Sequence, residues 1–191
     1  MKSRSGLRKF NGPAALLVLA LSGAAQATTL LRMSVEQMTG KAQAIVRARC
    51  LGNSTRWEEG EIWTFASFDV KEAWLGATAP RITVRLLGGR AGDLTSSVSG
   101  VPRFQPGEEV ILFLEPTGRG DFSVVSWQQG TFRIRRGASP GGEAVTQDTA
   151  ASSTFDPAAQ RFAAGGIRSM PLGAFRARVQ AALRTRGTTA P

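Results

Sequence analysis

From Ala44 onward, apolar and polar residues alternate within segments of strand length, and this alternation constrains the fold more than any other feature. A period of two places successive side chains on opposite faces of an extended strand. Gly, Pro and Asn residues separate the segments. The expected strands span 44–50, 61–73, 81–87, 109–115, 122–127, 131–136 and 143–147. Since no βαβ rhythm is present, the sheet is expected to be mainly antiparallel.

Two helices are expected to flank these strands. Ser34, followed three residues later by Gln37, is typical of a capping box, and the helix should end near Gly40. Helical spacing of apolar residues indicates a second helix over 169–186, capped by Ser169. Closure of the sheet would hide its edges. The sequence therefore predicts a mainly β fold, an antiparallel OB-like barrel of five to seven strands with a short N-terminal helix and a C-terminal amphipathic helix. A two-sheet sandwich is the alternative.

The first 27 residues have the layout of a secretory signal peptide. Basic residues precede a short apolar run over 14–21, and Ala25-Gln26-Ala27 forms a small-x-small cleavage motif after it. The run is shorter than the ~20 residues that span a bilayer. We therefore predict cleavage between Ala27 and Thr28, and export of a bacterial protein to the periplasm or the medium, without a transmembrane segment after signal removal. The mature chain divides into a β-barrel domain at 28–147, a flexible linker at 148–168 and the helix at 169–186, packed on the barrel.

The residue inventory argues against an enzyme. The chain has no His, which excludes Ser-His-Asp and Cys-His catalysis and the HExxH zinc site. Cys50 is the single cysteine, and its place in an apolar alternation favours a buried, inert thiol. We predict no catalytic residue, no metal site and no cofactor. The alternative is a His-independent hydrolase that uses the Ser67-Asp69-Lys71 triplet.

Arginine is the most suggestive residue type for binding. The net charge is +10, or about +6 once the four basic residues of the leader are removed. Arginines occupy the outward phase of several strands, with Trp63 nearby, and neighbouring strands would join them into a basic stripe. Guanidinium groups match phosphate, sulfate and carboxylate geometry, although a solvated sheet face predicts the same pattern. The candidate residues are Arg47, Arg49, Arg85, Arg133 and Arg135.

Trp57 is the tryptophan most expected to be exposed. It lies in a polar segment at 53–60, beside Glu58 and Glu59, that reads as a hairpin loop. An exposed loop Trp is a candidate for partner contact. Trp63, Trp74 and Trp127 are expected to serve mainly as core or cover residues.

Three motifs resemble bacterial secreted domains of the netrin-like group. They are A-x-A-I-V-x-A-x-C at 42–50, W-T-F-x-x-F-D-V-K-E-A-W-L-G at 63–76 and F-x-P-G-E-E-V-I-L-F-L at 104–114, and the resemblance covers about residues 34–135. That group shares the OB barrel with tissue inhibitors of metalloproteinases. Those inhibitors use an N-terminal cysteine and disulfides. A chain that starts at Thr28 with a single cysteine has neither, so no inhibitory residue is carried over.

The predicted function is that of an exported, non-catalytic binding domain. Its partner is expected to be an extracytoplasmic protein or an anionic envelope polymer, and no nucleic acid is expected because the protein is exported. A protease-inhibitor-like module that acts through its loops, at 53–60 or 88–102, is the alternative.

Overall fold

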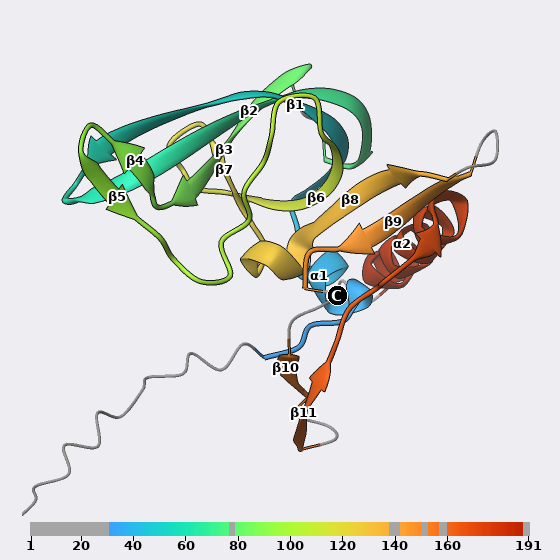
Figure 1. Ribbon diagram of the computed structural model, residues 1–191. Helices are drawn as coiled ribbons and strands as arrows, with labels where there is room; N and C mark the ends of the chain where they lie inside the picture. Colours follow the sequence, from blue (N-terminus) through green and yellow to red (C-terminus); the bar gives the residue numbers. More distant parts are fainter. Residues whose placement is uncertain (1–30, 77–78, 138–141, 150–152, 157–159, 189–191) are drawn as a thin grey trace, which may run out of the picture.

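The computed structural model describes residues 31–76, 79–137, 142–149, 153–156 and 160–188, and the expected leader with its Ala27–Thr28 cleavage site lies outside them. Figure 1 shows a curled sheet with helices at one end. The elements in chain order are α1 (Val35–Lys41), β1 (Ala44–Glu58), β2 (Glu61–Leu75), β3 (Arg81–Leu87), β4 (Gly89–Ala91), β5 (Leu94–Ser96), β6 (Glu109–Pro116), β7 (Phe122–Val124), the 3-10 helix η1 (Trp127–Gly130), β8 (Thr131–Arg136), β9 (Glu143–Gln147), β10 (Ser153–Asp156), β11 (Arg161–Ala164), β12 (Met170–Pro171) and α2 (Leu172–Thr188).

Five strands close into a barrel. β1, β2 and β3 form an antiparallel meander, β7 joins β3, and β6 pairs with both β7 and β1. The β3–β7 pairing is parallel, whereas the other pairings between described strands of this sheet are antiparallel, in agreement with the expected mainly antiparallel sheet. β6 also pairs with β8, so that β8, β9 and β12 continue the sheet away from the barrel. The predicted mainly β, OB-like barrel with flanking helices is confirmed.

Two apolar cores lie on opposite faces of the barrel wall. The inner core fills the barrel with side chains such as Val46, Ala48 and Leu112. The outer core lies between the barrel and the two helices and includes Ile111 and Phe113. β6 contributes to both cores, which explains why its sequence is apolar at consecutive positions rather than alternating.

The C-terminal helix packs on the outer core through one buried aromatic side chain. The Phe175 ring lies 4.6 Å from the Phe132 ring and 6.4 Å from the Phe113 ring, measured between centroids. The helix begins at Leu172 and not at Ser169, because Met170 and Pro171 form β12 against β9 and hold the chain extended there. The predicted cap at Ser169 is therefore wrong.

The N-terminal helix has the predicted capping box. The Gln37 N–H donates to Ser34 Oγ at 3.1 Å, and the Ser34 N–H donates to Gln37 Oε1 at 2.8 Å. Neither helix of the described chain combines the length and apolarity that crossing a bilayer requires.

The predicted loop at 53–60 is instead the continuation of β1. β1 and β2 remain paired to Glu58 and Glu61, beyond the end of the barrel. A register shift at Cys50–Gly52 lets the strand bend and continue, so the polar residues after it do not end the strand. The turn is Glu59–Gly60, with φ of 54° and 86°, as a tight hairpin of two residues requires. We call residues 53–66 of this pair the hairpin extension.

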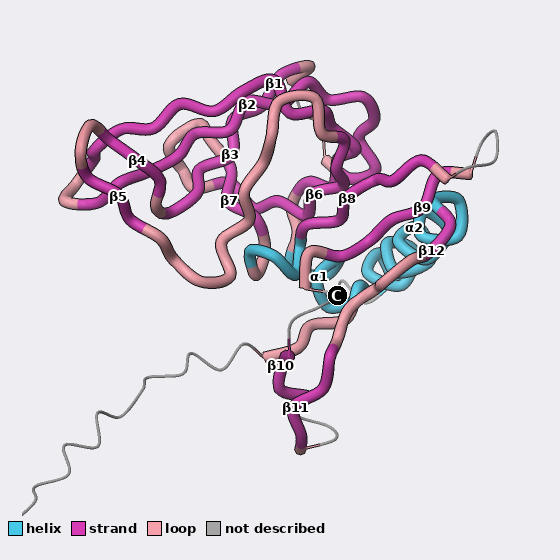
Figure 2. Tube along the Cα trace, viewed as in Figure 1, coloured by secondary structure: helices cyan, strands magenta, loops and turns pink. Residues whose placement is uncertain are grey.

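Two further hairpins fall in segments without a predicted strand. β4 and β5 lie within the expected loop at 88–102 and pair around Gly92-Asp93. β10 and β11 pair within the expected linker at 148–168. Figure 2 shows the β4–β5 hairpin beside the far ends of β1 and β2, and the β10–β11 hairpin projecting from the bottom of the molecule in this view.

An ion pair between α1 and α2 should make the free energy of unfolding depend on pH in the acidic range. Arg178 donates to both Glu36 oxygens, at 2.7 and 3.1 Å, and these bonds lower the pKa of Glu36 from 4.5 to about 2. A pKa that is lowered in the folded state stabilises above about pH 4.5, and this stabilisation is lost as the pH falls from 4.5 through 2. Since both side chains are well exposed, Glu36→Gln should cost less than ~1 kcal/mol at pH 7 and almost nothing at pH 2. Urea unfolding at the two pH values measures this.

Glu61→Gln is the control for that experiment, because Glu61 is exposed and forms no ion pair with a described residue. Its substitution should change stability equally at both pH values. A Glu36→Gln cost that persists unchanged at pH 2 would contradict the role of the ion pair.

Candidate partner-binding surface

The structure does not bring the predicted arginines onto one face. Cross-strand pairs share a face of the sheet, and β1, β6 and β8 are neighbours. Arg47 is paired with Ile111 of the outer core, whereas Arg133 is paired with Val110 of the inner core. Arg49 shares the phase of Arg47, and Arg135 shares that of Arg133. The expected continuous basic stripe is therefore absent from the described sheet.

Arg47 is neutralised by three carboxylates from three strands. Its guanidinium lies 3.7 Å from Glu72, 2.9 Å from Glu109 and 2.8 Å from Glu143. The hydrogen bond from Arg47 holds the pKa of Glu109 below its ordinary range. This arginine ties β1, β2, β6 and β9 together at the rim of the outer core.

Arg133 is neutralised in a similar way. It lies 2.6 Å from Glu108 and 2.5 Å from Asp148, and it also donates to the Arg103 carbonyl at 2.7 Å. By contrast, Arg49 and Arg135 are exposed and form no salt bridge with a described residue. These two free cations lie on opposite faces of the sheet.

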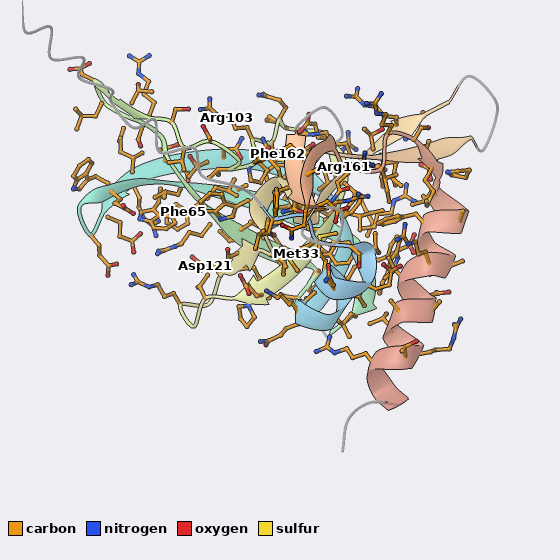
Figure 3. All side chains as sticks on the ribbon, turned by 90° about the horizontal axis from the view of Figure 1, so that it is seen from below. Met33, Phe65, Arg103, Asp121, Arg161 and Phe162 are labelled. Carbon is orange, nitrogen blue, oxygen red and sulfur yellow. The ribbon has the colours of Figure 1, made fainter. Side chains whose placement is uncertain are left out.

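Arg85 is buried, whereas its outward phase in the strand predicted a place at the surface. Its side chain is 8% exposed and donates to Glu58 at 2.9 Å and to Asp121 at 3.2 Å. The guanidinium carbon also lies 4.8 Å from the Trp63 ring centroid and 5.1 Å from that of Phe65. Figure 3 shows Phe65 and Asp121 on the same side of the molecule. The Trp63 ring therefore packs against the cluster that Arg85 forms with Glu58 and Asp121, which we call the Arg85 cluster.

The Arg85 cluster fixes the tip of the hairpin extension. Glu58 at the tip bonds to Arg85 on β3, and Glu59 accepts two bonds from Arg119, at 2.9 and 2.8 Å, on the β6–β7 turn. Arg119 holds the pKa of Glu59 below its ordinary range through these bonds. Asp121 in turn accepts a hydrogen bond from the Thr117 hydroxyl. The tip is thus held both by β3 and by the β6–β7 turn.

An apolar groove lies on the other face of the same tip. Trp57 and Ile62 are cross-strand partners in the phase that faces the barrel interior, but they lie beyond its end. The β4–β5 hairpin covers this face only in part. Trp57 remains 56% exposed and Leu94 58% exposed. The groove is lined by Trp57, Gly60, Glu61, Ile62, Leu87, Leu94, Thr95, Ser96 and Val98, and we call it the Trp57–Leu94 groove.

A second hollow lies at the barrel side of β4. Asn53, Thr55, Thr64 and Phe104 are among its lining residues. Gly89 approaches so closely that a Cβ there would lie 2.4 Å from the Thr64 hydroxyl. β4 therefore seats directly on the hairpin extension, and it separates this hollow from the Trp57–Leu94 groove.

In the triplet suggested for a hydrolase, Lys71 is paired with Asp69. Lys71 Nζ lies 2.6 Å from the Asp69 carboxylate, and the bond from Lys71 lowers the pKa of Asp69. No hydrogen bond joins Lys71 to Ser67 in the described chain. Within the same ranges, no group of three or more His, Cys, Asp or Glu side chains is placed to hold a metal ion.

Cys50 is buried in the inner core, as predicted. Burial raises the pKa of its thiol, which keeps the group protonated at neutral pH.

Comparison with known proteins gives no relative: no protein-family model, no curated protein and no solved structure matches this chain. The resemblance to the netrin-like group stays a prediction.

Of the sequence-predicted site residues, Trp57 is the one that the structure leaves exposed in a groove. Leu94, across the groove, was missed because it follows Asp93 in a segment read as loop. The sequence feature that could have identified Leu94 is an apolar residue directly after a Gly-Asp turn, which is typical of a short hairpin.

Proposed function

We propose that this protein is an exported, non-catalytic binding domain whose partner is an extracytoplasmic protein. The Trp57–Leu94 groove is the observation that carries the proposal. Two large apolar side chains, each more than half exposed, face one groove at the end of a firmly held hairpin. Buried aromatic anchors in a preformed groove supply much of the affinity in protein interfaces.

The charge distribution favours a protein over an anionic polymer as the partner. An anionic polymer is recognised by several free cations along one surface. Here Arg47, Arg85 and Arg133 are each paired with carboxylates of the chain itself. An apolar groove with few charges suits the side chains of another protein better.

Trp57→Ala is expected to abolish co-purification of the partner. The tagged chain is recovered from the extracytoplasmic fraction at moderate salt, and the partner is identified and purified. Its affinity for the variant should fall at least about tenfold, since truncation of an aromatic anchor typically costs 2 kcal/mol or more. Calorimetry with the two purified proteins measures this.

Leu51→Ala is the matched control, because Leu51 is 44% exposed but lies outside the groove. It should bind as the natural chain does. Equal affinity of the Trp57→Ala variant would remove the groove from the interface. If the partner is a protease that the chain inhibits, the inhibitor-like alternative replaces a simple binding role.

A further inference from the structure

The outer edge of β5 carries backbone groups without a partner in the described chain. β4 and β5 form a hairpin in which Ala91 and Leu94 flank a turn of two residues. In such a hairpin the next pair, Arg90 and Thr95, is the one without mutual hydrogen bonds. The N–H and C=O of Thr95 therefore point away from β4. β5 pairs with no other described strand, so this edge is open.

The open edge faces the Trp57–Leu94 groove. Leu94, Thr95 and Ser96 all line the groove, although consecutive side chains of a strand point to opposite faces. A groove that touches three consecutive residues runs along the edge of the strand rather than over one face. On its far side lie Trp57 and Ile62 of the hairpin extension.

A negative charge beside the groove favours some extended segments over others. Glu61 is the one charged residue among those that line it, and it lies at the rim, because its pairing with Glu58 places its side chain on the face opposite Trp57 and Ile62. Glu61 is exposed and forms no ion pair with a described residue, in contrast to Glu58 and Glu59 next to it. A long cationic side chain that reaches over this rim gains a partner, whereas an acidic side chain there is repelled.

We propose that the Trp57–Leu94 groove binds an extended segment of the partner protein as an added strand on β5. The backbone of the segment pairs with Thr95, and a large aliphatic side chain lies between Trp57 and Leu94. An adjacent Lys or Arg reaches over the rim of the groove to Glu61. Strand addition of this kind takes affinity from backbone hydrogen bonds and specificity from side-chain contacts. This inference rests on the proposed function and names the chemistry of the partner.

A displayed library of random 12-residue peptides tests the proposal. The chain is purified as the cell processes it, and the library is selected on it in parallel with the Trp57→Ala variant. Peptides enriched on the natural chain should share an aliphatic residue next to Lys or Arg. Synthetic copies should lose at least tenfold in affinity on Trp57→Ala and about threefold on Glu61→Gln, measured by fluorescence anisotropy.

Two controls separate the parts of the proposal. Glu115→Gln removes an exposed carboxylate away from the groove and should leave peptide affinity unchanged. N-methylation of the peptide amide next to the aliphatic residue removes a backbone donor, and it should reduce affinity at least tenfold if a strand is added. Equal binding of the methylated peptide would overturn strand addition.

Enrichment of acidic peptides, or enrichment of the same peptides on the Trp57→Ala variant, would contradict the proposed aliphatic and cationic character of the bound segment. If the purified partner still requires Trp57, the proposed function stands and the peptide inference fails. If neither the partner nor any peptide depends on Trp57, both fail.

Discussion

Replacement of Arg85 by alanine is expected to lower the free energy of unfolding by about 3–5 kcal/mol. The substitution leaves Asp121, whose side chain is 10% exposed, without its cation. It also removes the least exposed of the cations paired with Glu58 and empties the space beside the Trp63 and Phe65 rings. Urea unfolding followed by tryptophan fluorescence measures the loss.

Arg56→Ala is the matched control for Arg85→Ala. Arg56 also lies over Phe65, at 3.8 Å, and pairs with Glu58, but its side chain is 61% exposed. Its loss should therefore cost less than ~1 kcal/mol. The double variant Arg85→Met with Asp121→Asn removes a charge of each sign from the buried site, so it should recover part of the stability. Equal costs for Arg85→Ala and Arg56→Ala would contradict the buried cluster.

Phe175→Ala should destabilise the fold by about 3–5 kcal/mol, because it opens a cavity where three packed rings meet. Phe175 is fully buried against Phe132, Phe113 and Trp74. It is the aromatic residue through which α2 contacts the outer core. Thermal and urea unfolding of the variant measure the loss.

Gln180→Ala is the control on the same helix, since Gln180 is exposed and alanine is a better helix former. Its effect should stay within about 0.5 kcal/mol. If Phe175→Ala costs no more than Gln180→Ala, then α2 does not pack on the barrel.

Local sequence patterns were sufficient to predict those helices and strands that follow a single pattern, such as alternation, an apolar run or a capping box, along their whole length. Alternation over 81–87 predicted β3, with Val84 inside the barrel. The apolar run at 109–115 predicted a strand covered on both faces, and β6 contributes to both cores. Ser34 and Gln37 predicted α1 because a capping box is a contact between near neighbours.

The features that were not predicted depend on contacts between distant residues. Alternation places Arg85 on the outer face of β3, but it cannot show that Glu58 and Asp121 close over it. The polar residues after Cys50 predicted a loop, whereas pairing with β2 and a register shift keep them in a strand. Met170 is extended because it pairs with the edge of β9, and the local sequence does not show that this strand lies beside it.

The buried cluster and the groove occupy opposite faces of one hairpin. Arg85 and Arg119 hold Glu58 and Glu59, and Trp57 directly precedes them on the groove face. A tip held in this way presents Trp57 without a large ordering cost on binding. The acidic residues beside Trp57, read in the sequence as a solvated loop, are thus part of what positions it.

Cross-linking in living cells tests the central claim most directly. A photo-reactive amino acid is placed at position 94, across the groove from Trp57, and at position 51, which is exposed outside the groove. The account predicts one abundant protein adduct from position 94, lost on Trp57→Ala, and none from position 51. Equal adducts from both positions, or an adduct from position 94 that persists without Trp57, would contradict a partner bound in the groove.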